Sequence, residues 1–219
     1  MSATRQAVIF DCDGVLVDSE YLASRIEAEL IRALGLTLDI EEVHGLFLGK
    51  TVDGVLDAIA TRTGKRPDTA WAYNWAFATA HAFKRELQPV AGVRAVIEEL
   101  RRGGYALAVA SQSPLARVRF SLEVTGLDAL FGEQVYVTSM VERPKPAPDV
   151  YLLAAARLGV RPADCVVVED SPAAAAAARG AGMRAVGYAP GKTFDAMRAS
   201  GAVVIRSMDE LPAQLAAPG

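Results

Sequence analysis

AVIFDCDGVLVDSE (residues 7–20) is the stretch that decides the fold. It begins with four consecutive apolar residues and then places Asp11 and Asp13 two positions apart, followed by Gly14. A short apolar run bounded by acidic and turn-forming residues is typical of a buried strand in a parallel sheet. Ligands of open α/β sheets bind beyond the carboxyl ends of the strands, so we expect both carboxylates at a binding site. The structural alternative is that aspartate simply ends the strand and starts a turn.

Five further short runs rich in Val, Ile and Ala repeat this pattern and alternate with segments of helical spacing. Near-continuous hydrophobic strands that alternate with helices indicate a parallel sheet covered on both faces. The sequence therefore predicts an α/β fold with a doubly wound, Rossmann-like parallel sheet. The expected strands are AVIF (7–10), YALAVA (105–110), QVYVT (134–138), CVVV (165–168), RAVGYA (184–189) and AVVI (202–205).

The alternation stops between residues 19 and 88, where several helical segments follow one another without a convincing strand. We therefore predict a helical cap domain at 19–88, inserted into an α/β catalytic core made of 1–18 and 89–219. Its first helix carries an apolar stripe at four-residue steps, which predicts burial against neighbouring helices. Three aromatic residues further on are expected in the core of the cap. The stripe and the aromatic residues are Leu22, Ile26, Leu30 and Leu34, and Trp71, Trp75 and Phe77.

The composition limits the class of protein. Because 52% of the residues are hydrophobic and the net charge is only −3, neither disorder nor nucleic-acid binding is indicated. No apolar run approaches the roughly 18 to 20 residues of a membrane span, and the first residues do not resemble a secretory signal. Cys12 and Cys165 form no C-x-x-C pair, which argues against a disulfide framework or a zinc site. We expect a cytoplasmic protein without nucleic-acid or membrane partners, present as a monomer or a weak homodimer.

Polar residues also follow the second expected strand and precede a later helix. Ser111 comes directly after YALAVA, where its hydroxyl and the next backbone N–H groups can donate to an anion. The alternative is a helix N-cap, a role that Ser113 before Pro114 could fill instead. Lys145 lies between two prolines in ERPKPAPD and suits a point contact to phosphate, although an exposed loop lysine is the alternative. The bond from Lys145 to Pro146 can be cis or trans.

The strand CVVV leads into an acidic pair, Glu169 and Asp170. Adjacent carboxylates after a buried strand suit a hard cation, because magnesium prefers oxygen ligands. Four strand ends thus deliver acids, a serine and a lysine to the same edge of one sheet.

These four segments resemble, in order, the motifs of the haloacid dehalogenase-like superfamily: DCDGVLVDSE, the serine of VASQS, the lysine of RPKPAPD, and VVVEDSP. The chain most resembles the subgroup with a helical cap inserted after the first motif, which includes beta-phosphoglucomutase and many sugar-phosphate phosphatases. The resemblance covers nearly the whole chain and implies magnesium-dependent phosphoryl transfer through an aspartyl-phosphate. It is specific for fold and chemistry and says little about the substrate.

The same resemblance implies roles for individual residues. Asp11 would be the nucleophile, and Asp13 would protonate the leaving oxygen and later activate water. Phosphoryl oxygens would be bound by Ser111, Gln112 and Lys145. Mg²⁺ would be held by Asp11, the backbone carbonyl of Asp13 and Asp170, with Glu169 binding directly or through water.

Two activities remain open, and a phosphatase acting on a small phosphorylated metabolite is favoured over a phosphomutase. Aligned with beta-phosphoglucomutase, the cap histidine of the mutase falls on Ala23. The lysine of its K-G-x-S-R segment falls on Leu48, and the phosphate-binding arginine falls on Val52. A mutase must hold a bisphosphate, so the loss of these contacts favours hydrolysis. We expect substrate contacts in the cap from Gly49, Lys50 and Thr51. A third alternative is a binding protein that kept the fold and lost catalysis.

Overall fold

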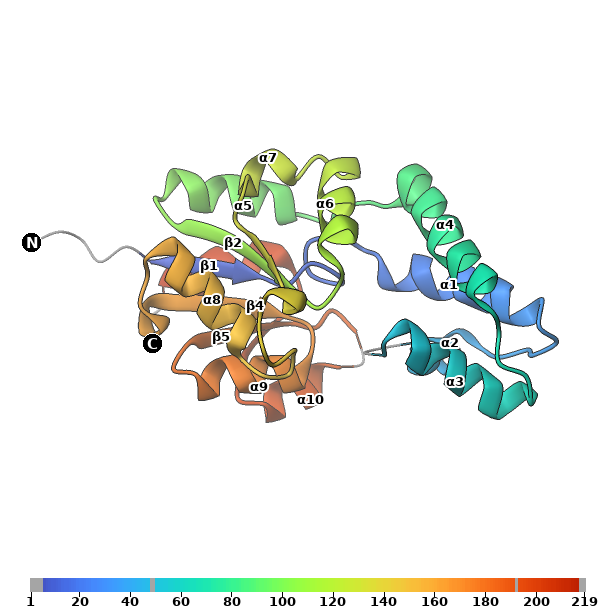
Figure 1. The fold of residues 1–219 in the computed structure, drawn as a ribbon. Helices are drawn as coiled ribbons and strands as arrows, with labels where there is room; N and C mark the ends of the chain where they lie inside the picture. Colours follow the sequence, from blue (N-terminus) through green and yellow to red (C-terminus); the bar gives the residue numbers. More distant parts are fainter. Residues whose placement is uncertain (1–5, 48–49, 192, 217–219) are drawn as a thin grey trace, which may run out of the picture. The chain divides into compact units, whose positions relative to one another are not determined.

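The computed structural model describes residues 6–47, 50–191 and 193–216, and all structural statements refer to these residues. The chain forms two compact units, Met1–Val17 with Pro89–Gly219, and Asp18–Gln88. The sheet lies entirely in the first unit, and the ribbon of the second unit is helical (Figure 1). No helix in the described ranges is long and apolar enough to cross a membrane.

The first unit is built on a six-stranded sheet with the strand order β3-β2-β1-β4-β5-β6. All neighbouring strands pair in parallel, and β1 lies in the middle between β2 and β4. Each predicted apolar run forms a strand, so the predicted doubly wound α/β fold is confirmed. The strands are β1 (Ala7–Phe10), β2 (Ala106–Ser111), β3 (Val135–Val137), β4 (Cys165–Glu169), β5 (Arg184–Tyr188) and β6 (Val203–Ile205).

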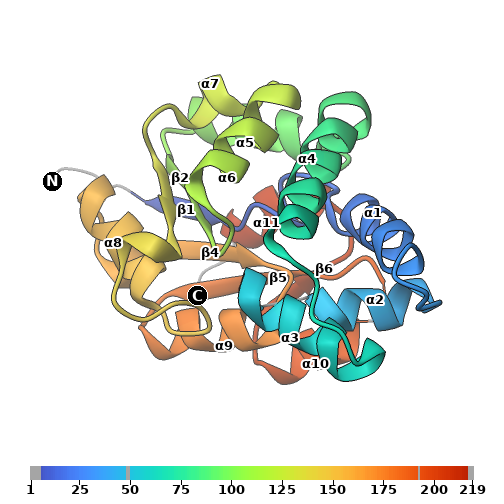
Figure 2. The ribbon, with the colours of Figure 1, turned by 45° about the vertical axis from the view of Figure 1, so that its right-hand side comes forward.

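Helices cover both faces of this sheet, with α5 and α7 on one side and α8 and α9 on the other (Figure 2). Covering both faces explains why the strands are continuously apolar, since neither face of β1, β2 or β4 meets water. The helices of this unit are α5 (Val93–Arg102), α6 (Leu115–Val124), α7 (Asp128–Phe131), α8 (Asp149–Leu158), α9 (Pro172–Gly180), α10 (Phe194–Ala199) and α11 (Leu211–Ala216). Short 3₁₀ turns span Thr138–Met140, Pro162–Asp164 and Met208–Glu210.

Small side chains let α8 and α9 lie close to the sheet. The cluster beneath them consists mainly of alanine and valine side chains from both the strands and the helices, and Tyr151 of α8 is its largest member. In the alanine-rich helix α9, Ala174 and Ala178 belong to this cluster. Ser171 caps α9 by accepting a hydrogen bond from the N–H of Ala174, and Pro172 occupies the first turn.

The second unit consists of four helices: α1 (Glu20–Arg32), α2 (Ile40–Phe47), α3 (Val52–Thr63) and α4 (Thr69–Glu86). The predicted leucine stripe of α1 is wrong in part, because Leu22 is buried while Leu34 is 37% exposed and lies beyond the end of the helix. Ala28 and Ile31 are buried instead. With about 3.6 residues per turn, each four-residue step drifts by about 40°, so such a stripe leaves the buried face after a few steps.

Aromatic residues of α4 contribute to the core of the second unit only in part. Trp71 and Trp75 pack against its hydrophobic cluster, and the ring of Trp75 lies 5.0 Å from that of Phe47 in an edge-to-face arrangement. Phe77 is 72% exposed, so the prediction that it belongs to the core is wrong. Two residues further along the helix than Trp75, its side chain points to a different side.

Candidate active site

The carboxyl ends of β2, β1 and β4 bring the predicted residues of the core together. Because these strands are neighbours in the sheet, Ser111, Asp11 and Glu169 follow or end adjacent strands. The N–H of Asp11 donates to the carbonyl of Val168 at 2.9 Å, which extends the pairing of β1 with β4 by one residue. The chain then turns at Gly14, whose φ of 75° favours glycine.

Lys145 contacts all three of these strand ends through a single ammonium group. Its Nζ donates to Asp11 Oδ1 at 2.7 Å, to Glu169 Oε1 at 2.5 Å and to the backbone carbonyl of Ala110 at 2.8 Å. An ammonium has three protons, so all of them are used. The Lys145 side chain is 6% exposed, which is incompatible with the alternative of an exposed loop lysine. The peptide bond from Lys145 to Pro146 is cis.

Charge and burial in this cluster shift the pKa values of both partners. Burial raises the pKa of Asp11 to about 7, against the opposing effect of Lys145 and with further increases from Glu169 and Asp13. Burial acts to lower the pKa of Lys145, but the carboxylates of Asp11 and Glu169 outweigh it and hold that pKa well above its ordinary value. The metal-free site thus favours a charged lysine beside an aspartate that is reluctant to ionise.

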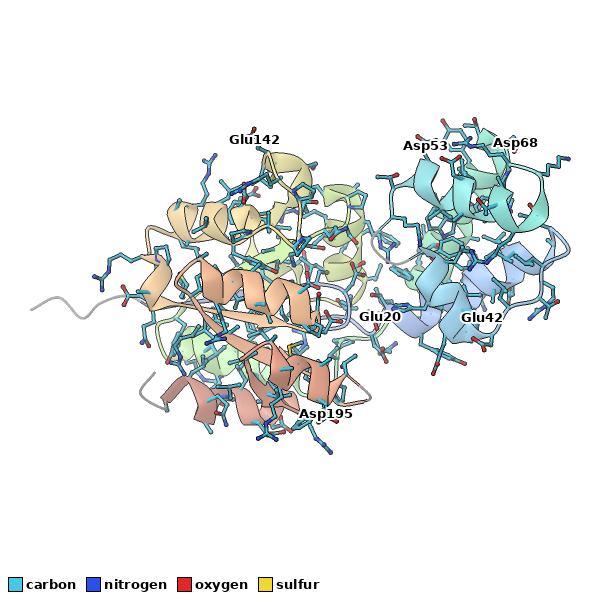
Figure 3. The ribbon with its side chains drawn as sticks, turned by 90° about the horizontal axis from the view of Figure 1, so that it is seen from below. Glu20, Glu42, Asp53, Asp68, Glu142 and Asp195 are labelled. Carbon is cyan, nitrogen blue, oxygen red and sulfur yellow. The ribbon has the colours of Figure 1, made fainter. Side chains whose placement is uncertain are left out.

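Among the described residues three acids are buried, and two of them, Asp11 and Glu169, belong to this site, while the third, Glu27, lies in α1 of the second unit. Asp11 is 8% exposed and Glu169 is 1% exposed. By contrast, the acids labelled in Figure 3 are all solvent-exposed: Glu20, Glu42, Asp53, Asp68, Glu142 and Asp195. Two neighbouring buried carboxylates need compensating positive charge, and Lys145 supplies one such charge.

Three carboxylates are arranged so that they could share one cation. Asp11, Glu169 and Asp170 each offer an oxygen, and these oxygens lie within 4.8 Å of one another. With Lys145 ionised, three ionised carboxylates leave a net charge of −2 in this cluster. A divalent cation with oxygen ligands, such as Mg²⁺, fits both that charge and the donor set. The side chain of Asp13 is not part of this cluster.

Asp13 is held by one residue just before α6 and by one in the first turn of α6. Ser113 Oγ donates to Asp13 Oδ2 at 2.6 Å, and Arg117 Nη2 lies 3.4 Å from Asp13 Oδ1. Neither Ser111 nor Ser113 caps α6, because its N-cap is Pro114 without a side-chain cap bond. The capping alternative for both serines is therefore wrong.

Ser111 and Gln112 take up different positions in the loop after β2. Ser111 is 1% exposed, and its Oγ accepts a hydrogen bond from the N–H of Ser113 at 3.1 Å, which leaves its own proton for another acceptor. Gln112 is exposed, and its backbone carbonyl accepts from Thr138 Oγ1 at 3.3 Å. Binding of phosphate by either residue stays a prediction.

The predicted cap residues make local contacts in the second unit. Lys50 Nζ donates to the carbonyls of Gly45 and Leu46 at 2.9 and 2.8 Å, in the last turn of α2. Thr51 caps α3 by accepting from the N–H of Gly54 at 3.1 Å. Gly49 lies outside the described residues. These contacts give Lys50 and Thr51 structural roles, and substrate binding by the three residues stays a prediction.

Three residues that are not predicted from the sequence as part of the site contact its predicted residues: Tyr151, Ser113 and Arg117. Tyr151 Oη donates to Glu169 Oε1 at 2.5 Å from within α8, where its sequence context indicates only a packed helix residue. Burial and the negative charge of Glu169 raise the pKa of Tyr151, so its hydroxyl stays protonated. Ser113 had the one usable signal, a second hydroxyl two residues after Ser111 at a strand end.

Comparison with known proteins identifies the family. The family model of the haloacid dehalogenase-like hydrolases matches residues 6–182, and the chain belongs to this family. It is 30% identical over 179 residues to 6-phosphogluconate phosphatase of Escherichia coli K12, covering 81% of this chain and 80% of that protein. It is 33% identical over 190 residues to hexitol phosphatase B of the same organism, covering 85% of each chain.

A solved structure of the family has the same fold. It is a HAD family hydrolase from Deinococcus radiodurans R1 with bound phosphate and sodium, which is 35% identical to this chain. The two superpose with a TM-score of 0.82, covering 98% of this chain and 96% of the other. The resemblance to the haloacid dehalogenase-like superfamily is thus confirmed.

Proposed function

We propose that the protein is a Mg²⁺-dependent phosphatase that hydrolyses a small phosphorylated metabolite through an aspartyl-phosphate on Asp11. The observation that carries the proposal is the buried contact of Lys145 with Asp11 and Glu169, at 2.7 and 2.5 Å. The ammonium of Lys145 is shared by two buried carboxylates, and the carboxylate of Asp170 lies close to them. Such a site suits a divalent metal ion and a phosphoryl group.

In the first step, an oxygen of Asp11 attacks the phosphorus, and the bond between phosphorus and the leaving oxygen breaks. Asp13 gives a proton to that oxygen, so the product leaves as an alcohol. Lys145 loosens its contact with Asp11 and compensates the charge on the phosphoryl oxygens, together with the hydroxyl of Ser111. Mg²⁺, held by Asp11, Glu169 and Asp170, would supply further positive charge at the phosphoryl oxygens.

In the second step, Asp13 takes a proton from water, whose oxygen attacks the phosphorus of the aspartyl-phosphate. The bond between Asp11 and phosphorus breaks, and inorganic phosphate and the free carboxylate are formed. Ser113 and Arg117 hold the carboxylate of Asp13 from the side of α6, which fits a group that must act twice at a fixed place.

Sugar, polyol and sugar-acid phosphates are the proposed substrate class. The support is the similarity to two enzymes named 6-phosphogluconate phosphatase and hexitol phosphatase B. The phosphomutase alternative has no better support, because Ala23 and Val52 carry no charge or hydrogen-bonding side chain at the aligned mutase positions. A cytoplasmic location and a monomeric or weakly dimeric state stay predictions.

Phosphate release from a panel of sugar, polyol and sugar-acid monophosphates, measured with and without Mg²⁺, tests the proposal. We expect magnesium-dependent release by the wild type and its loss in Asp11→Asn and Asp13→Asn. Isomerisation of a hexose 1-phosphate in the presence of a bisphosphate, without phosphate release, would show that the enzyme is a mutase.

A further inference from the structure

Tyr151 contacts both partners of the buried ion pair, although the proposed chemistry does not use it. It lies on α8, its side chain is fully buried, and its Oη donates to Glu169 Oε1 at 2.5 Å. Lys145 Nζ lies over its ring at 4.8 Å from the centroid, a cation–π distance. The tyrosine thus supports the lysine with its ring and the glutamate with its hydroxyl.

The hydroxyl determines which oxygen of Glu169 can face a cation. Oε1 accepts from both Tyr151 Oη and Lys145 Nζ, and two donors fill the lone-pair positions of one carboxylate oxygen. Oε2 accepts a hydrogen bond from the N–H of Ser171 at 3.2 Å, and its second lone-pair position is available for another ligand. Oε2 is therefore the oxygen available to a metal ion or to a water bound to it.

We propose that Tyr151 is a positioning residue that fixes the rotation of the Glu169 carboxylate and thereby sets the affinity of the site for Mg²⁺. The inference deepens the proposed function and rests on its metal-assisted chemistry. Without the hydroxyl, Oε1 would keep one donor and a buried lone pair without a partner, so the carboxylate would rotate to regain a hydrogen bond. Replacing a residue that hydrogen-bonds to a metal ligand and orients it typically lowers the metal affinity by about 10- to 100-fold.

Tyr151→Phe isolates the hydroxyl, because phenylalanine keeps the ring against Lys145 and in the buried cluster. Tyr136→Phe is the matched control: Tyr136 Oη also donates a short hydrogen bond, 2.6 Å to Gln134 Oε1, and its ring packs against the same cluster. The measurement is calorimetric titration of Mg²⁺ into phosphate-free protein, with far-UV circular dichroism to verify folding.

We expect the dissociation constant for Mg²⁺ to rise at least about tenfold in Tyr151→Phe and to stay within about twofold of wild type in Tyr136→Phe. In a Glu169→Gln background, adding Tyr151→Phe should cause no further rise, because the hydroxyl acts through Glu169. A folded Tyr151→Phe variant with an unchanged constant would overturn the proposal. An equal rise with and without Glu169→Gln would do the same, since it would indicate a general structural effect.

The Mg²⁺ titration does not depend on turnover, so it tests the role of Tyr151 separately from the proposed function, which the phosphate-release panel tests. Hydrolysis by the wild type with an unchanged constant in Tyr151→Phe would refute the role of Tyr151 and leave the proposed function standing. If the dissociation constant for Mg²⁺ rises in Tyr151→Phe while the wild type hydrolyses no phosphate ester, the positioning role of Tyr151 is supported and the proposed function is refuted.

Discussion

Replacing Lys145 by methionine should strongly destabilise the metal-free protein. The side chain of Lys145 is 6% exposed and its ammonium is shared by Asp11 and Glu169 at 2.7 and 2.5 Å. Removing one partner of a buried ion pair typically costs about 3 to 5 kcal/mol, because the remaining charge stays buried without compensation. Here two carboxylates would remain, so at pH 8 we expect a loss in that range for Lys145→Met.

Urea unfolding followed by far-UV circular dichroism measures this loss. Both tryptophans lie in the second unit, so tryptophan fluorescence would report mainly on Asp18–Gln88. With a slope of about 2 kcal/mol per molar urea, the midpoint should fall by about 1.5 to 2.5 M. Lys84→Met removes an exposed lysine and should change the stability by less than about 0.5 kcal/mol.

Two further measurements test the physical reason. Mg²⁺ should restore part of the stability of Lys145→Met, because it supplies charge to the same carboxylates. At pH 5 the loss should be smaller, since Asp11, with a pKa of about 7 even beside Lys145, takes up a proton. A loss below about 1 kcal/mol at pH 8, or a loss independent of pH and Mg²⁺, would refute the reasoning.

Three more outcomes are expected. Burial raises the pKa of Asp11 from 3.8 to about 7, so between these pH values the native state binds more protons than the unfolded state. The free energy of unfolding of the metal-free protein should therefore fall as the pH rises from about 4 to 7. Urea titrations at several pH values should show a weaker pH dependence of this free energy in Asp11→Asn. Asp13→Asn should lower kcat for a sugar phosphate by about 10²- to 10⁴-fold. It should still release a burst of nitrophenolate from p-nitrophenyl phosphate, because this leaving group needs no proton. The absence of a burst in stopped-flow absorbance would contradict this prediction. Ser113→Ala should lower kcat about tenfold and leave the dissociation constant for Mg²⁺ unchanged, because Ser113 contacts Asp13 and not the carboxylate cluster.

Periodicity and strand-end chemistry were enough to predict the sheet and the core of the candidate site. Fully apolar strands such as CVVV are unambiguous in an α/β pattern, and parallel strands bring Asp11, Ser111 and Glu169 to one edge whatever the loops do. Lys145 was predictable because the chain offers few other lysines and places two prolines around this one.

Tyr151 and Arg117 could not be found in this way, because they reach the site from within helices. Their roles depend on the face that each helix turns towards the strand ends, and nothing in the sequence around Tyr151 distinguishes it from an ordinary core residue. The exposure of Phe77 also depends on the helix face. Trp75 and Phe77 are two residues apart, so their side chains point to different sides of α4 and only Trp75 packs against the core of the second unit.

The covalent intermediate tests the central claim most directly. Asp13→Asn, mixed with p-nitrophenyl phosphate and Mg²⁺ and quenched in acid, can be digested with trypsin and examined by mass spectrometry. We predict one added phosphoryl group on Asp11, in the peptide of residues 6–25 between Arg5 and Arg25, and none when Asp11 is also replaced by asparagine. Phosphate release by Asp11→Asn at the wild-type rate, or a phosphoryl group on another residue, would contradict the account.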